Sequence, residues 1–308
     1  MAMLKLSIFQ VLQVEIQKMH VAAMIQPLFA NRVGILATMH HKEQVIAPIL
    51  EQKLGIQVIV PSNFNTDYFG TFTREVQRLG NQIETARLKA EKALAVTGET
   101  LAFASEGTFG PHPAMPFIAC NREVVVLLDT ANQLEIIGQQ FSTETNYSHR
   151  SVDSVQAAEE FAHQVGFPEH ALVVMATASP TDTSEIIKEI TTKEQLESAV
   201  TFFLNKSGNS QVHIETDMRA LYNPTRMKNI AKATHDLIKK ISDVCPKCSL
   251  PSWELVQKNK GLRCAACNLP TELTLSIIYR CKKCNFTETL FPDRWKKADP
   301  SQCMYCNP

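Results

Sequence analysis

The chain has 308 residues, of which 44% are hydrophobic and 20% are charged. This composition supports a packed core and excludes a disordered acidic or basic protein. The formal net charge is zero, so overall charge indicates neither a nucleic acid nor a membrane as the partner. Because no segment approaches the roughly 20 apolar residues of a spanning helix, we expect a soluble, cytoplasmic protein with no membrane partner.

Residues 1–30 are an N-terminal extension that we expect to form a short helix. Glu15, Lys18 and His20 interrupt its apolar run and no small-residue cleavage site follows, which argues against a secretory signal. Met24 is an alternative start, so the sequence leaves open whether residues 1–23 belong to the native protein.

Residues 31–243 have the pattern of an α/β domain. Strands are expected at 33–38, 56–60, 101–105, 123–128, 134–141, 171–177 and 211–215. Helices are expected at 42–54, 82–96, 153–165, 192–204 and 225–241. This alternation predicts a mixed sheet with helices on both faces.

Residues 244–308 form a cysteine-rich tail that we expect to be a small zinc-ribbon domain. Its four Cys-x-x-Cys pairs are Cys245/Cys248, Cys264/Cys267, Cys281/Cys284 and Cys303/Cys306. Such a turn aims two thiolates at one point, which makes half of a tetrahedral zinc site. Repeated two-residue gaps favour metal over disulfides, so the tail predicts two zinc ions. Sites with four cysteines are closed, which gives the metal a structural role, and a redox role for one pair is the alternative.

The pairing of these half-sites is open in the sequence. Fifteen residues separate the first two pairs and eighteen separate the last two, and either gap fits a hairpin. The simplest arrangement is sequential, with two consecutive ribbons. An interleaved arrangement, with the first pair beside the third and the second beside the fourth, is the alternative.

The tail also allows a nucleic-acid partner. It holds ten Lys/Arg and five Asp/Glu, hence +5, and two centres of about −2 each reduce this to about +1. Trp253 and Trp295 can stack on bases, although aromatic side chains in a small zinc module more commonly form its core.

Polar clusters at the ends of predicted elements are the candidate binding residues of the α/β domain, because α/β folds place ligands there. Thr38, His40 and Lys42 follow the first strand, and Lys42 at a helix start can hold a phosphate. Glu106 and His112 lie in a stretch with two glycines and two prolines, which predicts a tight loop and the best active-site candidate.

A further cluster precedes the last helix. Glu215 and Asp217 alternate along a strand and suit Mg²⁺, while Arg219, Asn223 and Arg226 suit phosphate. The plainer explanations are an internal ion-pair network here, and ordinary turns or solvated helix ends for the other clusters.

Two resemblances emerge from these motifs. ATMHHKE, ASEGTFGPHP, HIETDMRALYNPTRM and the cysteine pairs before the terminal CNP resemble a bacterial family described only as a domain of unknown function. The order of the motifs is also similar to the inosine/xanthosine triphosphate pyrophosphatase superfamily. The matching residues are Ala37-Thr38 with Lys42, Glu84-Thr-Ala-Arg-Leu-Lys89-Ala90, Glu106-Gly107 and Asn223-Pro-Thr-Arg226.

The second resemblance implies that Glu84 and Glu106 hold Mg²⁺, while Lys42 and Arg226 bind a triphosphate whose α-phosphorus is attacked by water. The chain departs from that superfamily in its shorter Thr38-to-Lys42 spacing and in Ser-Glu-Gly where many members have Asp-Ser-Gly. Residues 143–215 match the superfamily poorly, and the zinc tail is foreign to it.

The leading prediction is a Mg²⁺-dependent, nucleoside-triphosphate pyrophosphatase-like hydrolase of a nucleotide or other phosphate compound. It requires Lys42, Glu84, Glu106 and Arg226 to meet in one cleft. One alternative is a non-catalytic protein whose zinc ribbon binds nucleic acid or a protein. The other is a different phosphate- or sugar-handling enzyme centred on Glu215, Asp217 and Arg219.

Overall fold

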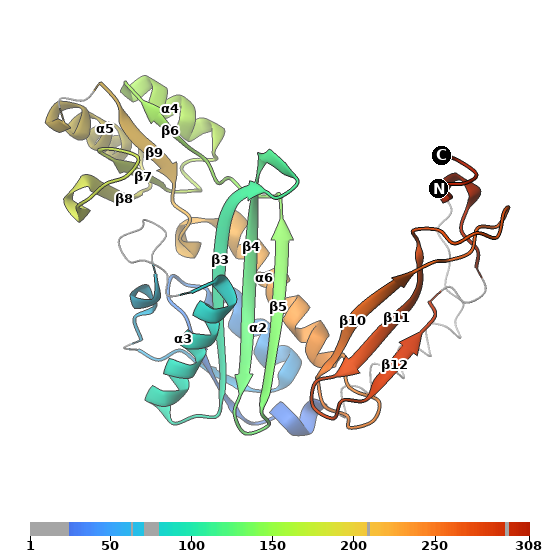
Figure 1. Ribbon diagram of the computed structural model, residues 1–308. Coiled ribbons are helices and arrows are strands. Elements are labelled where there is room, and N and C mark those ends of the chain that lie inside the picture. Colours follow the sequence, from blue (N-terminus) through green and yellow to red (C-terminus); the bar gives the residue numbers. More distant parts are fainter. Residues whose placement is uncertain (1–24, 63, 71–79, 208–209, 293–295) are drawn as a thin grey trace. The chain divides into compact units, whose positions relative to one another are not determined.

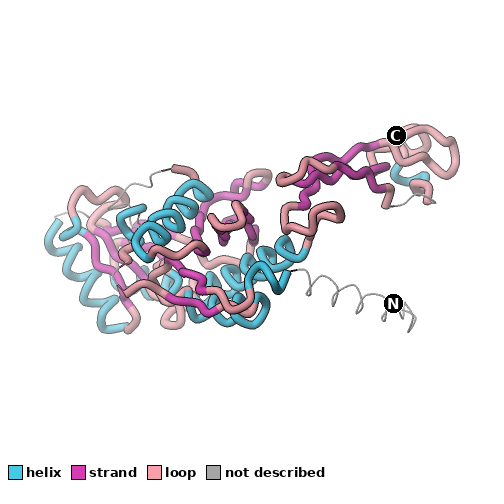
Figure 2. Tube along the Cα trace, turned by 90° about the horizontal axis from the view of Figure 1, so that it is seen from below, coloured by secondary structure: helices cyan, strands magenta, loops and turns pink. Residues whose placement is uncertain are grey.

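The computed structural model describes residues 25–62, 64–70, 80–207, 210–292 and 296–308 (Figure 1). It contains two compact units, one formed by Phe29–Ile238 and another that includes Lys239–Pro308. The first unit mixes helices and strands, whereas the cysteine-rich tail consists of strands and loops with very little helix (Figure 2). Residues 1–24 of the predicted extension lie outside the described residues, and residues 25–29 are helical.

The larger sheet of the first unit has five strands in the order β2-β1-β3-β4-β5. The strands are β1 (Val33–Ala37), β2 (Gln57–Ile59), β3 (Leu101–His112), β4 (Met115–Asp129) and β5 (Leu134–Ser142). β1 is parallel to β2 and β3, and β4 and β5 continue the sheet as an antiparallel meander. Helices α2 (Glu43–Leu54) and α3 (Gln82–Thr97) follow β1 and β2, as crossovers between parallel strands require. The predicted mixed sheet flanked by helices is therefore confirmed.

Small residues bring helices close to both faces of this sheet. Ala86, Ala90 and Ala93 of α3 are fully buried on one face. On the other face, α6 (Pro224–Ser242) crosses β5 at Gly138, where an added Cβ would overlap its backbone. Figure 1 shows α3 in front of the sheet and α6 behind it.

A second sheet in the same unit has four strands in the order β6-β9-β7-β8. The strands are β6 (His149–Val152), β7 (Leu172–Met175), β8 (Ile186–Ile190) and β9 (Val212–Thr216). Helices α4 (Val155–Gln164) and α5 (Lys193–Ser207) pack on one face and bury Phe161 and Phe203. Neither β6 nor β8 was predictable from the local sequence, because His149-Arg-Ser is polar and β8 follows a turn-rich segment.

The predicted loop around Glu106 and His112 is wrong, because these residues continue β3. Its antiparallel partner β4 stays in register as far as Pro111, opposite Ala119. β1 pairs only with Ala102–Ala104, so the outer part of β3 lies at a sheet edge, where proline is tolerated.

The tail contains a three-stranded antiparallel sheet, β10-β11-β12. Its strands are β10 (Trp253–Lys260), β11 (Thr274–Cys281) and β12 (Thr287–Leu290). Among all the helices of the described segments, none has the length and apolar character needed to cross a membrane.

Candidate functional site

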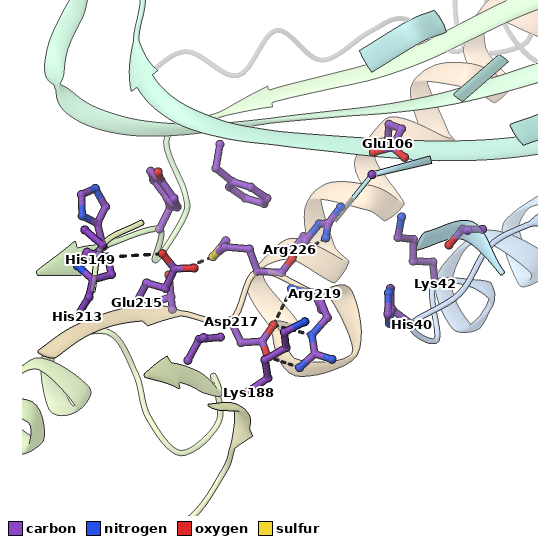
Figure 3. A pocket seen from close by; sticks show the side chains of 18 of the residues that line it. His40, Lys42, Glu106, His149, Lys188, His213, Glu215, Asp217, Arg219 and Arg226 are labelled. Atoms are coloured by element: carbon purple, nitrogen blue, oxygen red, sulfur yellow. Dashed lines mark hydrogen bonds and ion pairs between the residues drawn. The ribbon is translucent and has the colours of Figure 1, made fainter. Parts of the chain in front are cut away.

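A pocket of about 450 Å³ in the first unit brings together side chains from both of its sheets (Figure 3). Lys42, Glu106 and Arg226 come from the side of the large sheet. His149 and the polar residues of β9 line the opposite side. The pocket therefore lies beyond the carboxyl end of β1, the position at which α/β sheets bind ligands.

Lys42 is a buried amine in this pocket. Its side chain is only 7% exposed, and Nζ donates a hydrogen bond to the backbone oxygen of Ser105 at 3.4 Å. Within the described part of the chain, no carboxylate forms an ion pair with it. Burial, together with the positive charge of Arg226, lowers the pKa of Lys42 to about 7, although the charges of Glu106 and Glu123 partly oppose this shift. An anionic ligand would supply the missing counter-charge.

The turn that carries Lys42 is strained. His40 and His41, immediately before it, both have left-handed backbones, with φ of 63° and 61°. Non-glycine residues in this region cost up to about 1–3 kcal/mol each and concentrate at functional sites. His40 also lines the pocket, so this turn places both an imidazole and an amine there.

Glu106 forms a buried ion pair with Lys89 across the interface between β3 and α3. Glu106 is 5% exposed and Lys89 is 4% exposed, and both line the pocket. Gln82 at the start of α3 donates to the backbone oxygens of Glu106 and Arg122, each at 2.7 Å. The helix therefore fixes the strand that carries the carboxylate.

Arg226 is held by a second buried ion pair. Its Nε donates to Oε1 of Glu123 on β4 at 2.9 Å, and Nη1 donates to the backbone oxygen of Met218. A Cβ at Gly107 would overlap both partners, so this glycine allows the pair to form across β3. The charge of Arg226 is thus largely balanced. Of the three described cations Lys42, Lys89 and Arg226, Lys42 is the one without an ion pair to a carboxylate.

The second sheet and the turn after it contribute two pairs of polar residues to the pocket, Asp217 with Arg219 and His213 with Glu215. Asp217 accepts from Nε of Arg219 at 3.1 Å and from its Nη2 at 2.6 Å. Arg219 also donates to Glu189, and these carboxylates raise its pKa against the opposing effect of burial. His213 and Glu215 lie on the pocket face of β9.

Most of the predicted site residues meet in this pocket. They are His40, Lys42, Glu106, Glu215, Asp217, Arg219 and Arg226. Because both oxygens of Asp217 bind Arg219, the ion-pair explanation for that part of the cluster holds, and Asp217 is not a free Mg²⁺ ligand.

Four predicted residues do not line the pocket. Glu84 is exposed and completes the capping box of α3 by accepting from the backbone N–H of Asn81, so the predicted meeting of Glu84 and Glu106 is wrong. Thr38 lines a neighbouring hollow, and His112 packs on Phe141 near the tip of the β3–β4 hairpin. Asn223 is buried, and its Oδ1 accepts from the backbone N–H of Arg226 in the first turn of α6.

The site contains further residues for which the sequence motifs predicted no role. Lys89 of α3 is buried beside Glu106. Glu123 is fully buried, and a lone carboxylate directly before Val124-Val125-Val126 was a signal that could have been used. His149 lies in a strand that was not predicted.

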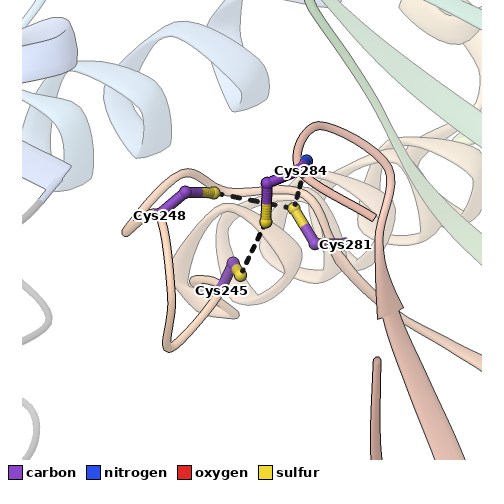
Figure 4. A group of neighbouring side chains, drawn as sticks. All are labelled: Cys245, Cys248, Cys281 and Cys284. Carbon is purple, nitrogen blue, oxygen red and sulfur yellow. Dashed lines mark hydrogen bonds between the residues drawn. The ribbon is translucent and has the colours of Figure 1, made fainter. Parts of the chain in front are cut away.

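No set of three or more carboxylate or histidine side chains in the described segments has the close spacing of a preformed metal site; only the cysteines do. The two sets are Cys245, Cys248, Cys281, Cys284 and Cys264, Cys267, Cys303, Cys306. The pairing is therefore interleaved, and the sequential arrangement is wrong (Figure 4).

The interleaving follows from the strand between the first two pairs. β10 has eight residues, which span about 26 Å when extended, so Cys248 and Cys264 lie at opposite ends of it. The antiparallel return of β11 places Cys281 opposite Trp253 at the start of β10. Each set of four cysteines thus closes one end of the hairpin.

Both sets fit zinc. The Sγ atoms of Cys245 and Cys284 are 3.7 Å apart, and those of Cys264 and Cys306 are 3.8 Å apart. Four thiolates at about 2.3 Å from a tetrahedral zinc lie about 3.8 Å from one another.

Trp253 packs against other aromatic side chains of the tail. Trp253 stacks on Tyr279 and on Phe286, with ring centroids 5.6 and 5.7 Å away. This arrangement agrees with the core explanation for Trp253, while Trp295 lies outside the described residues. Binding of nucleic acid or a protein by the tail stays a prediction.

A family model described as a domain of unknown function (DUF6671) matches residues 89–308, well over half of the chain. The chain therefore belongs to this family, in agreement with the first resemblance of its motifs. The family description assigns no activity. No curated protein matches the chain.

Proposed function

Because the chain belongs to a family without an assigned activity, we propose its function from the pocket: it binds a nucleotide or a similar phosphate compound and hydrolyses it with Mg²⁺. The observation that carries the proposal is Lys42, a buried amine without a carboxylate partner among the described residues. A buried ammonium with no direct ion pair is costly, and a phosphate that binds it would form the charge-assisted hydrogen bonds it lacks.

The remaining groups have distinct roles in this proposal. Lys42 binds the phosphate directly, and His40 beside it lines the same wall. Arg226, tied to Glu123, shapes the pocket and adds hydrogen-bond donors rather than net charge. Lys89 holds Glu106 in place through their ion pair.

Glu106 is the carboxylate that would hold Mg²⁺. Mg²⁺ is commonly bound by one or two carboxylates together with substrate phosphates, so a single carboxylate suits a metal that enters with the nucleotide. When bound, the metal would neutralise charge on the phosphates during attack by water. The pocket walls position the phosphate.

The similarity of the motif order to inosine/xanthosine triphosphate pyrophosphatases supports a triphosphate as the substrate. Lys42, Glu106 and Arg226 are the motif residues that share the pocket. Glu84 departs from the role implied by that similarity, because it caps α3. Three of the four residues implied by that similarity therefore support a triphosphate, and Lys89 joins them by its ion pair with Glu106.

The test is release of pyrophosphate from a panel of nucleoside triphosphates with Mg²⁺. We expect Glu106→Gln to lower kcat about 100-fold or more, as the loss of one well-placed electrostatic group does. Glu91→Gln is the matched control, because Glu91 is an exposed carboxylate on α3. Turnover by the wild type no higher than that of Glu106→Gln would contradict the proposal.

A further inference from the structure

Three side chains outside the proposed phosphate site form a cluster on the second sheet. His213 and Glu215 are two residues apart on β9, so they point to the same face. His149 of β6 is the register partner of Glu215 on the adjacent strand. The opposite face of β9 bears Val212 and Ile214, which are buried in the core against α4 and α5. All three cluster residues line the pocket (Figure 3).

His213 is not explained by ordinary packing. Its side chain is 6% exposed, and its Nδ1 is buried without a hydrogen-bond partner in the described structure. Its Nε2 lies 3.7 Å from Oε2 of Glu215, which is too far for a hydrogen bond. The orphan Nδ1 costs about 1–3 kcal/mol. Neither ring nitrogen of His213 has a hydrogen bond among the described residues, so no hydrogen bond fixes the ring, and Nε2 is the nitrogen that lies toward Glu215.

We propose that His149, His213 and Glu215 bind a first-row transition-metal dication such as Zn²⁺, Mn²⁺ or Co²⁺. Two imidazoles with one carboxylate suit these ions, whereas Mg²⁺ takes oxygen ligands. Ligands bonded at about 2.0–2.2 Å in a tetrahedral site are roughly 3.4 Å apart. The His213–Glu215 separation of 3.7 Å is close to this value.

His149 completes the set by turning its ring. Its centroid is 5.5 Å from that of His213, with the ring planes tilted by 40°. Metal binding requires a nitrogen of His149 to rotate toward the other two ligands about its side-chain torsions. The His149 side chain is exposed and lines the pocket, so no packing in the hydrophobic core opposes this rotation.

The site differs in kind from the two cysteine sites. Four thiolates leave no position open, whereas three protein ligands leave one for water or a ligand group. The inference does not rest on the proposed hydrolase, because metal binding can be measured without any substrate. Its failure would leave the phosphate site on Lys42 and Glu106 untouched.

The experiment uses the full chain with zinc in both cysteine sites. It is dialysed against Co²⁺ and desalted, and each metal is quantified by mass spectrometry. We expect one Co²⁺ per chain beyond the metal in the two cysteine sets. Its absorption should lack the sulfur-to-cobalt charge-transfer band of a thiolate site.

Glu215→Gln and His213→Ala should each lose this additional metal while retaining the metal in the cysteine sites, which shows that the chain is folded. Should His213→Ala fail to fold, the isosteric Glu215→Gln decides the question. His163→Ala is the matched control, because His163 is exposed on α4 and should leave the stoichiometry unchanged. A wild type that binds no additional metal, or a Glu215→Gln variant that keeps it, would overturn the site.

Discussion

The cysteine tail and the pocket of the first unit gather their polar groups by different means. In the tail, eight ligands of one type lie between residues 245 and 306, and their two-residue gaps already form half-sites. In the pocket, Lys42, Glu106 and Arg226 come from three distant segments, and packed helices hold them together. The ligands of a repeated local motif can therefore be predicted from the sequence, whereas the residues that form the pocket can be identified only in the folded structure.

The two regions also differ in what stabilises them. The first unit buries two apolar clusters, one beneath α3 and one beneath α4 and α5. Among the described tail residues from Cys245 onward, the buried hydrophobic side chains are four cysteines with Leu262 and Ala298. Metal must therefore supply much of the folding free energy of the tail.

The largest expected effect is removal of zinc. Binding to a structural site contributes on the order of 10 kcal/mol, so chelation or Cys281→Ser should unfold β10–β12 and leave β3 and β4 intact. Hydrogen exchange of the full chain, followed by peptide mass spectrometry, measures both regions at once. Equal protection of β10 with and without metal would show that the tail has a sufficient core of its own.

A smaller effect is expected in the first unit from Gly107→Ala. The added Cβ overlaps Glu123 and Arg226, and breaking a buried ion pair costs about 3–5 kcal/mol. Urea unfolding gives the change in the free energy of unfolding. Gly110→Ala is the matched control, since nothing lies within 4 Å of a Cβ there and little change is expected. Equal free energies of unfolding of the two variants would show that Gly107 is not required for the Glu123–Arg226 ion pair.

The smallest expected effect is a pH dependence at Lys42. Its pKa in the free protein is about 7, below the usual 10.5, so the amine loses its charge as pH rises above 7. A bound anion favours the charged form and raises this pKa, so binding takes up a proton above pH 7. Affinity should therefore fall with rising pH, by at most about tenfold per unit.

Sulfate is a suitable probe for that measurement, because its charge is constant between neutral and alkaline pH. Titration by calorimetry at several pH values gives the slope. Lys42→Arg keeps its charge and should bind sulfate with a flatter profile. An identical slope in wild type and Lys42→Arg would assign the pH dependence to another group.

Some features of the fold were predictable because they depend on local patterns. The helical spacing of apolar residues predicted α3, and Asn81 with Glu84 form a capping box at its start. Local composition misled at Glu106, where two glycines and two prolines suggested a loop. Pairing with β4 overrode this local preference and extended the strand through Gly110.

The sequence by itself determined the composition of the metal sites and the α/β class, because cysteine spacing and hydrophobic periodicity act over a few residues. Only the tertiary structure decided how the cysteine pairs combine, because the extended β10 separates Cys248 from Cys264. It likewise decided that Glu84 caps a helix while Lys89 reaches Glu106. Both outcomes depend on which elements pack together, and the burial that leaves Lys42 without a carboxylate partner among the described residues is a property of the assembled unit.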